Sequence, residues 1–104
     1  MLQLRLSEEA QNDLREIRAF TKQQWGTAQS SRYLKEIQVK IELLSSNPLI
    51  GLDRSDDLKK GLRSLLVNSH VIYYRHDEKN LIVQAILHHA MAPIEHLRQR
   101  KATI

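Results

Sequence analysis

Residues 8–47 are patterned as two amphipathic helices separated by one glycine, and this pairing constrains the fold more than any other feature of the chain. Apolar side chains recur every three or four positions, the spacing of one helix face. In the first helix they are Ala10, Leu14, Ile17 and Phe20, and in the second they are Leu34, Ile37, Ile41 and Leu44, with Tyr33 beside them. Gly26 can end the first helix in a left-handed conformation, and Thr27 can cap the second. Because the connection is so short, we predict an antiparallel helical hairpin.

Boundary signals indicate where this hairpin begins and ends. Ser7 can accept a hydrogen bond at the start of the first helix. Glu8 and Glu9 then place negative charge in the first turn, where the helix dipole favours it. The second helix should stop at Asn47, because a residue that precedes proline is disfavoured in helical conformation.

The rest of the chain predicts strands joined by turns. Residues 2–6 alternate apolar and polar side chains, the period of a half-buried strand. Residues 48–61 contain proline, glycines and several charges, and predict a loop. Three runs rich in β-branched and aromatic residues predict an antiparallel meander; they are Leu62–Val67, Val71–Arg75 and Leu81–Leu87. The last run is almost entirely apolar, so we expect it in the centre of the sheet, buried on both faces.

The order of these elements predicts the fold class. A short C-terminal helix should begin at Pro93, since proline is favoured at the first helical position. We predict an α+β protein of order β-α-α-β-β-β with this short C-terminal helix. In this two-layer fold, the helical hairpin is expected to form one layer and to pack on the other, a mostly antiparallel four-stranded sheet. No repeat or long linker interrupts the 104 residues, so residues 1–104 are expected to form a single domain.

Composition limits the setting in which the protein works. The 16 basic and 12 acidic residues give a net charge of +4, which favours an acidic partner, either a protein or a nucleic acid. There is no cysteine, which excludes disulfides and thiolate metal sites. No apolar run is long enough to span a membrane. We therefore expect a cytoplasmic protein without membrane contact.

The sequence lacks the common patterns of catalytic and metal-binding sites. No histidine pair has the helical spacing of metal ligands, and there is neither a glycine-rich phosphate loop nor a nucleophile elbow. His88 and His89 should point to opposite faces of a strand. We therefore expect no metal, no cofactor and no catalytic residue.

One chemistry stays open. Metal-free cleavage of RNA needs a base and cations beside the scissile phosphate. Candidates on or near the strands are Arg63, Arg75, His70, His88 and His89. Composition favours the simpler interpretation that the two arginines are outward-facing charges that keep the sheet soluble.

Four stretches of the chain, in their order and spacing, together resemble a known family. They are Leu6–Ala10 with Asp13–Ile17; Gln24–Gly26 with Ala28-Gln29 and Tyr33-Leu34; Asn47-Pro48 with Gly51; and Gly61–Ser64 running into His70–Arg75 and then Ile86–Met91. The pattern resembles the ParE branch of the RelE/ParE toxin superfamily, the toxin half of type II toxin–antitoxin modules. The resemblance covers about residues 4–97, and the family fold agrees with the order of elements predicted from periodicity.

The resemblance implies a function. It implies a bacterial toxin that is not an enzyme and that inhibits DNA gyrase, so that replication stalls. A ParD-like antitoxin with an acidic tail would neutralise it by wrapping over the helical hairpin and the sheet, and would connect it indirectly to operator DNA. A helix laid in an apolar groove is a common mode of recognition, which is compatible with this picture.

Candidate binding residues follow from charge and from the resemblance. Arg63 and Arg75 should join the acid-free C-terminal cations in one basic patch that meets the target or the antitoxin. The full set of candidates is Arg63, Arg75, His89, Met91, Arg98, Arg100 and Lys101. Trp25 and Tyr33 are candidates for the antitoxin groove, although we expect Trp25 to contribute mainly to packing at the hairpin turn.

Two alternative functions stay open beside inhibition of gyrase. A ribosome-associated mRNA endonuclease of the RelE type would use Arg63, Arg75 and His88 or His89. However, His70 and Ala90–Ala92 stand where that branch tends to have catalytic residues. ParE relatives often carry arginine in the last strand and aspartate after the methionine, where this chain has Gln84 and Ala92. An inactive relative that only binds antitoxin is therefore the other alternative.

Overall fold

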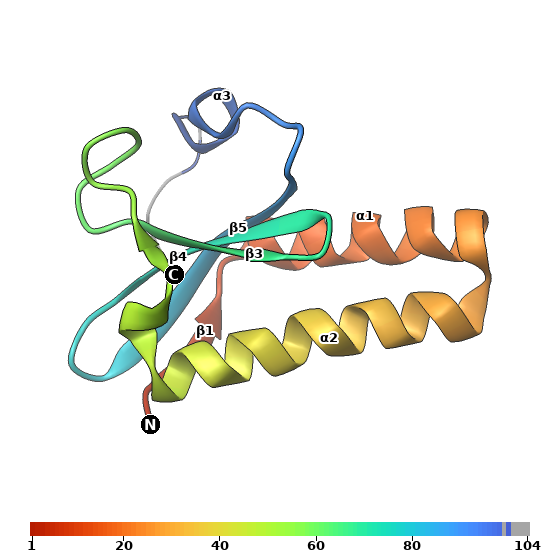
Figure 1. Ribbon diagram of the computed structural model, residues 1–104, viewed down its shortest axis with the longest axis horizontal. Coiled ribbons are helices and arrows are strands. Elements are labelled where there is room, and N and C mark those ends of the chain that lie inside the picture. The colour runs from red at the N-terminus through yellow and green to blue at the C-terminus, as the bar shows by residue number, and fades with distance from the viewer. Residues whose placement is uncertain (99, 101–104) are drawn as a thin grey trace.

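A computed structural model describes residues 1–98 and 100 of the chain (Figure 1). Its elements occur in the order β1 (Gln3–Leu6), α1 (Glu8–Trp25), α2 (Thr27–Ser46), a 3-10 helix η1 (Pro48–Ile50), β2 (Leu52–Asp53), β3 (Arg63–Val67), β4 (His70–His76), β5 (Asn80–His88) and α3 (Pro93–Arg98). The α+β class, the helical hairpin and the short C-terminal helix are confirmed. No helix among the described residues is long and apolar enough to cross a membrane.

The sheet has five strands, in the order β1-β5-β4-β3-β2, and not the four that the sequence predicts. β1 runs parallel to β5 and the other pairs are antiparallel, so the sheet is mostly antiparallel as expected. The extra strand β2 lies within the expected loop, where Leu52 pairs with Ser64 and Asp53 with Arg63. A strand of two residues is too short to show the alternation of apolar and polar side chains, so its position could not be predicted from the sequence.

The core lies on both faces of the sheet. The larger cluster fills the space between the sheet and the hairpin: Ala10, Ile17, Ile37, Ile41, Leu44, Val67, Ile72, Tyr74, Leu81, Val83 and Ile86. A smaller cluster covers the other face, where Leu58 and Leu97 pack against Leu62, Tyr73, Ala85 and Leu87. β5 is buried from Leu81 to Leu87, which confirms its predicted burial. It lies inside the sheet between β1 and β4, whereas the middle strand of the five is β4.

The apolar stripe of α2 is confirmed, but the stripe of α1 ends before Phe20. The Phe20 side chain is 58% exposed, while Thr21 is 1% exposed and takes the inward position one turn after Ile17. Thr21 can be buried because its Oγ1 donates to the Ile17 carbonyl at 2.7 Å and lies 2.6 Å from Ser30 Oγ on α2. Figure 1 shows that the far end of the hairpin projects beyond the sheet.

The helix boundaries agree with the sequence in all but one detail. Ser7 Oγ accepts a hydrogen bond from the Ala10 amide at 3.0 Å, as an N-cap should. Gly26 has a φ of +87° and ends α1. It is Gly26 and not Thr27 that holds the N-cap position of α2, where no side chain forms a capping bond.

Candidate functional site

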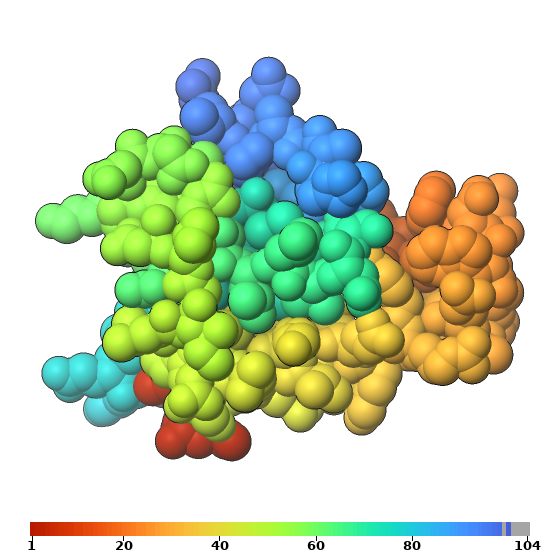
Figure 2. Space-filling model, in the orientation of Figure 1, coloured from red at the N-terminus to blue at the C-terminus, as the bar shows by residue number. Residues whose placement is uncertain are grey.

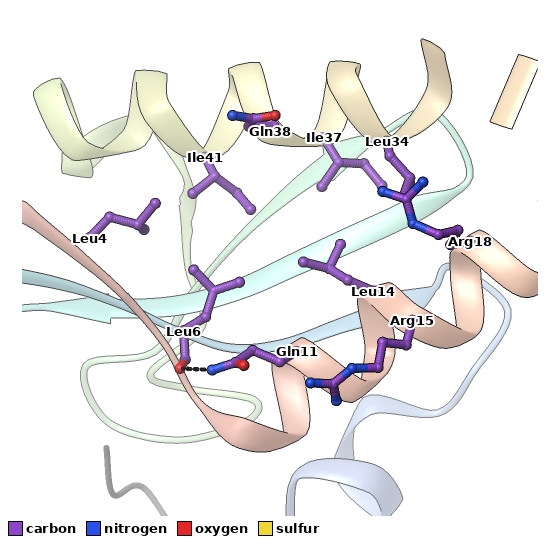
Figure 3. Close-up of a pocket in the computed structure, with 10 residues that line it drawn as sticks. All are labelled: Leu4, Leu6, Gln11, Leu14, Arg15, Arg18, Leu34, Ile37, Gln38 and Ile41. Atoms are coloured by element: carbon purple, nitrogen blue, oxygen red, sulfur yellow. Dashed lines mark hydrogen bonds between the residues drawn. The ribbon is translucent and has the colours of Figure 1, made fainter. Parts of the chain in front are cut away.

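A groove of about 400 Å³ lies between α1 and α2, with β1 at one end (Figure 3). Its floor is apolar because the inner flanks of the two helix stripes meet there. The lining side chains of this kind are Leu4, Leu6, Leu14, Leu34, Ile37 and Ile41. Leu14 and Leu34 are only partly buried against the core. The groove therefore exposes apolar surface that the fold itself does not cover.

Cationic and amide groups form the rim of this groove. Gln11, Arg15 and Arg18 come from α1, and Gln38 comes from α2. The Gln11 side chain is held by its Nε2, which donates to the Leu6 carbonyl at 3.1 Å. No carboxylate of residues 1–98 or 100 lines the groove. An apolar floor with a positive rim fits an amphipathic helix that carries acidic residues.

The strand beside the groove is an edge of the sheet. β1 stands at the end of the strand order and pairs with β5 alone. An open edge can accept an extended segment from another chain. This part of the surface can therefore receive both a helix and an adjoining extended segment.

Trp25 and Tyr33 do not line this groove. The Trp25 side chain is 45% exposed at the end of α1, and its ring centroid lies 5.7 Å from that of Tyr33. The Tyr33 hydroxyl accepts a hydrogen bond from the Ser69 amide at 3.2 Å and forms a second hydrogen bond with His70 Nδ1 at 2.6 Å. Tyr33 therefore connects the hairpin to the turn between β3 and β4, and Trp25 packs beside Tyr33.

A row of rings continues from Tyr33 along the end of the sheet. His70 lies 5.5 Å from Tyr33 and 5.4 Å from His88, and His88 stacks on His89 at 4.5 Å between centroids. The expectation that the two adjacent histidines point to opposite faces is therefore wrong, because β5 ends at His88. Burial lowers the pKa of His70 to about 4, helped by the nearby His88 and His89 and opposed by Asp13. Among the described residues, no three or more histidine, aspartate or glutamate side chains are arranged so that they could hold a metal ion.

The described members of the expected basic patch do not all lie on one face. Arg63 pairs across the sheet with Tyr74 and donates from Nη1 to the Gly51 carbonyl at 2.6 Å. Arg75 follows Tyr74 on β4 and so points to the opposite face from Arg63. Arg98 is exposed at the end of α3, while Lys101 lies outside the described residues.

Arg100 is turned inward and holds α1 against β5. Its Nη1 and Nη2 donate to the two carboxylate oxygens of Asp13 at 2.8 and 3.0 Å, and its Nε lies 3.4 Å from Glu9. Asp13 raises the pKa of this guanidinium. The same carboxylate accepts the Ile86 amide of β5 at 2.9 Å. Arg100 is thus a structural cation, and Asp13 is the partner that the sequence analysis missed.

A bulge in β5 explains why Arg100 finds a second acceptor there. Tyr73 pairs with Ala85 and Tyr74 with Val83, which leaves Gln84 as the extra residue. Its carbonyl accepts from Arg100 Nη1 at 3.1 Å and from Ser7 Oγ at 3.2 Å. The bulge therefore connects the C-terminal segment to the start of α1.

The remaining two candidates follow the end of β5. His89 donates its amide to the Ser69 carbonyl at 2.9 Å, which fixes the segment to the turn between β3 and β4. Met91 is 39% exposed and lines a second cavity, on the other side of α1 from the groove.

Comparison with known proteins connects this chain to toxins. Residues 4–93 match the family described as ParE toxin of type II toxin-antitoxin system, parDE. Toxin ParE1 of Caulobacter vibrioides is 34% identical over 93 residues, which cover 89% of this chain and 95% of the relative. Toxin ParE1 of Mycobacterium tuberculosis H37Rv is 38% identical over 87 residues, which cover 83% and 88%.

Solved structures share the fold at lower identity. The structure described as the chromosomal ParDE TA system from P. aeruginosa superposes with a TM-score of 0.73 at 19% identity, covering 85% of this chain and 96% of that one. A YafQ mutant from E. coli gives a TM-score of 0.55 at 14% identity, with coverage of 86% and 96%.

Proposed function

Because the chain belongs to the ParE family, the toxins of type II toxin-antitoxin systems, we propose that it acts by docking onto other macromolecules and not by turning over a substrate. Its target is DNA gyrase, which it inhibits so that replication stalls. A ParD-like antitoxin neutralises it and provides its indirect connection to operator DNA. Both encounters take place in the cytoplasm.

The antitoxin occupies the groove between α1 and α2. The observation that carries this assignment is the combination of an apolar floor with the cations Arg15 and Arg18 and no carboxylate lining the groove among the described residues. An acidic amphipathic helix places its apolar face on Leu4, Leu14 and Leu34 while its carboxylates meet the arginines. Opposite charges also speed encounter and fix the register of the helix.

The separation of the cationic residues favours docking over RNA cleavage. Arg63 and Arg75 point to opposite faces of the sheet. His88 Nδ1 accepts the Ala90 amide at 3.1 Å, and His70 Nδ1 is occupied by Tyr33. A ribonuclease would need its base and cations on one face beside the same phosphate.

Two measurements test the two parts of this proposal. Purified protein should inhibit supercoiling by gyrase and should leave RNA intact; RNA cleavage that disappears in His88→Ala or Arg63→Ala would overturn the docking mechanism. For the groove, Arg18→Glu and Leu34→Glu should each weaken binding of a ParD-like antitoxin at least tenfold. Arg32→Glu, an exposed change on α2 outside the groove, is the matched control and should bind as the parent does.

A further inference from the structure

The two flanks of α1 carry opposite charge. Arg15 and Arg18 line the groove on one flank. Glu9 and Glu16 lie about two turns apart and share the other flank, with Phe20 one turn beyond Glu16. An occupant suited to the groove is therefore unsuited to the opposite flank.

A separate cavity of about 300 Å³ opens on the acidic flank, between α1 and the ends of β4 and β5. Ile17 and Phe20 form one wall, and Met91 and Leu87 come from the other side. Phe20 and Met91 are 58% and 39% exposed. Figure 2 shows the surface hollowed between the projecting end of the hairpin and the segment that follows β5. Exposed aromatic and methionine side chains at a hollow are typical of the centre of a protein interface.

The charge around this cavity is negative and incompletely balanced. Arg100 is engaged by Asp13 and Glu9, at 2.8 and 3.4 Å. Within the described part of the chain, Glu16 has no ion pair. His70, which also lines the cavity, is neutral near pH 7 because burial lowers its pKa to about 4. Among the described residues, Asp13, Glu9 and Glu16 thus place three carboxylates around one guanidinium, with His88 lining this cavity and His96 the adjoining surface, on a protein whose net charge is +4.

We propose that this acidic flank, defined as Glu9, Glu16, Phe20 and Met91, is a second docking surface, which takes a basic segment of a protein partner. The aliphatic stem of an arginine or lysine lies on Phe20 and Met91, and its cation meets Glu16. Carboxylates repel an acidic antitoxin tail and a nucleic acid alike. Because the groove lies on the opposite side of α1 from the acidic flank, both surfaces can be occupied at the same time.

The proposal is tested with short peptides on the full chain. The probe is a capped pentapeptide in which leucine alternates with arginine, and its matched control has glutamate in place of arginine. Amide chemical shifts of labelled protein report where each peptide binds. The variants are Glu16→Gln and Phe20→Ser, neither of which removes a core contact, with Glu42→Gln on α2 as the control for lost charge. The spectrum of each free variant shows whether it is folded.

The arginine peptide should shift amides around Glu16, Phe20 and Met91, and the glutamate peptide should not. Glu16→Gln and Phe20→Ser should each weaken that binding at least fivefold, while Glu42→Gln should leave it unchanged. The proposal is overturned if the arginine peptide produces no localised shifts at millimolar concentration. It is equally overturned if the glutamate peptide binds the same residues, or if binding survives both substitutions. Because the readout involves neither gyrase nor antitoxin, its failure is distinct from failure of the proposed function.

Discussion

Arg100 and Asp13 stand 87 positions apart in the sequence, yet their side chains are joined by two hydrogen bonds. Asp13 also accepts a hydrogen bond from the Ile86 amide, so one carboxylate connects α1, strand β5 and the C-terminal segment. The Asp13 side chain is 9% exposed and that of Arg100 is 14% exposed. Burial makes the pair sensitive to loss of either member, because the remaining charge loses its principal partner: Arg100 would keep the Gln84 carbonyl and Glu9, and Asp13 would keep the Ile86 amide.

Removing the two members of this pair should have unequal effects on stability. Asp13→Ala leaves the Ile86 amide without its acceptor and, among the described residues, leaves Arg100 with only the Gln84 carbonyl and the more distant Glu9. It should lower the free energy of unfolding by about 2–4 kcal/mol. Arg100→Ala leaves the hydrogen bond from the Ile86 amide to Asp13 in place. It should therefore lower the free energy of unfolding by about 1–2 kcal/mol less than Asp13→Ala does. Urea denaturation measures both, with Arg98→Ala as an exposed control expected near zero. Equal losses for the two variants would show that the amide contact contributes nothing.

A second prediction concerns Gly51, which sits against the buried ring of Tyr74. The Tyr74 hydroxyl accepts the Gly51 amide at 2.9 Å and donates to the Pro48 carbonyl at 2.6 Å. Tyr74→Phe should therefore cost about 1–3 kcal/mol, because both backbone groups lose their partner. A Cβ on residue 51 would lie 2.3 Å from the Tyr74 hydroxyl and 2.9 Å from the Ser64 carbonyl.

Gly51→Ala should consequently destabilise the protein more than Tyr74→Phe does. Combining the two should recover only part of the loss, because the clash with the Ser64 backbone stays after the hydroxyl has gone. Thermal unfolding of the two single variants and the double variant measures this coupling. A Gly51→Ala protein as stable as the parent would mean that the loop moves away from Tyr74 at no cost.

Thr21 and Ser30 give a third prediction, on the connection between α1 and α2. Their hydroxyl oxygens lie 2.6 Å apart and both residues are fully buried. Thr21→Val keeps the shape but leaves the Ser30 hydroxyl with one long bond, to the Arg18 carbonyl at 3.4 Å. It should cost about 1–2 kcal/mol, and adding Ser30→Ala should restore much of that loss, since an unpaired buried hydroxyl is worse than none. A double variant less stable than Thr21→Val would contradict this reasoning.

Local signals explain which parts of the fold the sequence could predict. Ser7, Gly26 and Asn47 act on their own neighbours, so the helix boundaries were predictable within a residue. The stripe of α2 was predictable because Ile37, Ile41 and Leu44 all reach the core between the hairpin and the sheet. Phe20 has nearly the spacing of a core residue, but Thr21, one turn after Ile17, takes the inward position, and Phe20 lies at the surface beside the end of β5.

Contacts between distant segments explain what the sequence could not show. β2 exists because Leu52 and Asp53 meet β3, and the groove exists because two helices and β1 meet along their flanks. Charge counting grouped Arg100 with the exposed cations because nothing local indicates its turn toward Asp13. A useful signal was nonetheless present: Asp13 stands between Ala10 and Ile17 on the inward face of the helix, and a carboxylate there requires a buried partner.

His70 should make stability depend on pH between about 4 and 6.5. Its pKa is lowered from 6.5 to about 4, chiefly by burial, with His88 and His89 adding to the effect and Asp13 opposing it. Between these values the unfolded chain binds a proton that the folded chain does not. Stability is therefore retained above pH 6.5 and declines as the pH falls toward 4. Because the ring is only partly buried, we expect a loss of about 1–2 kcal/mol after allowing for solvent screening.

The contribution of His70 can be separated from that of the carboxylates by comparing variants. His70→Asn should flatten the dependence of stability on pH in this window, whereas His76→Asn, at the other end of β4, should leave it as in the parent. Tyr33→Phe removes the hydrogen bond to Nδ1 but not the burial, so it should keep most of the slope. Titration of the His70 ring by NMR measures its pKa directly. A pKa near 6.5 in the folded protein would contradict the assignment of the pH dependence to His70, because protonation of the ring would then have no effect on stability.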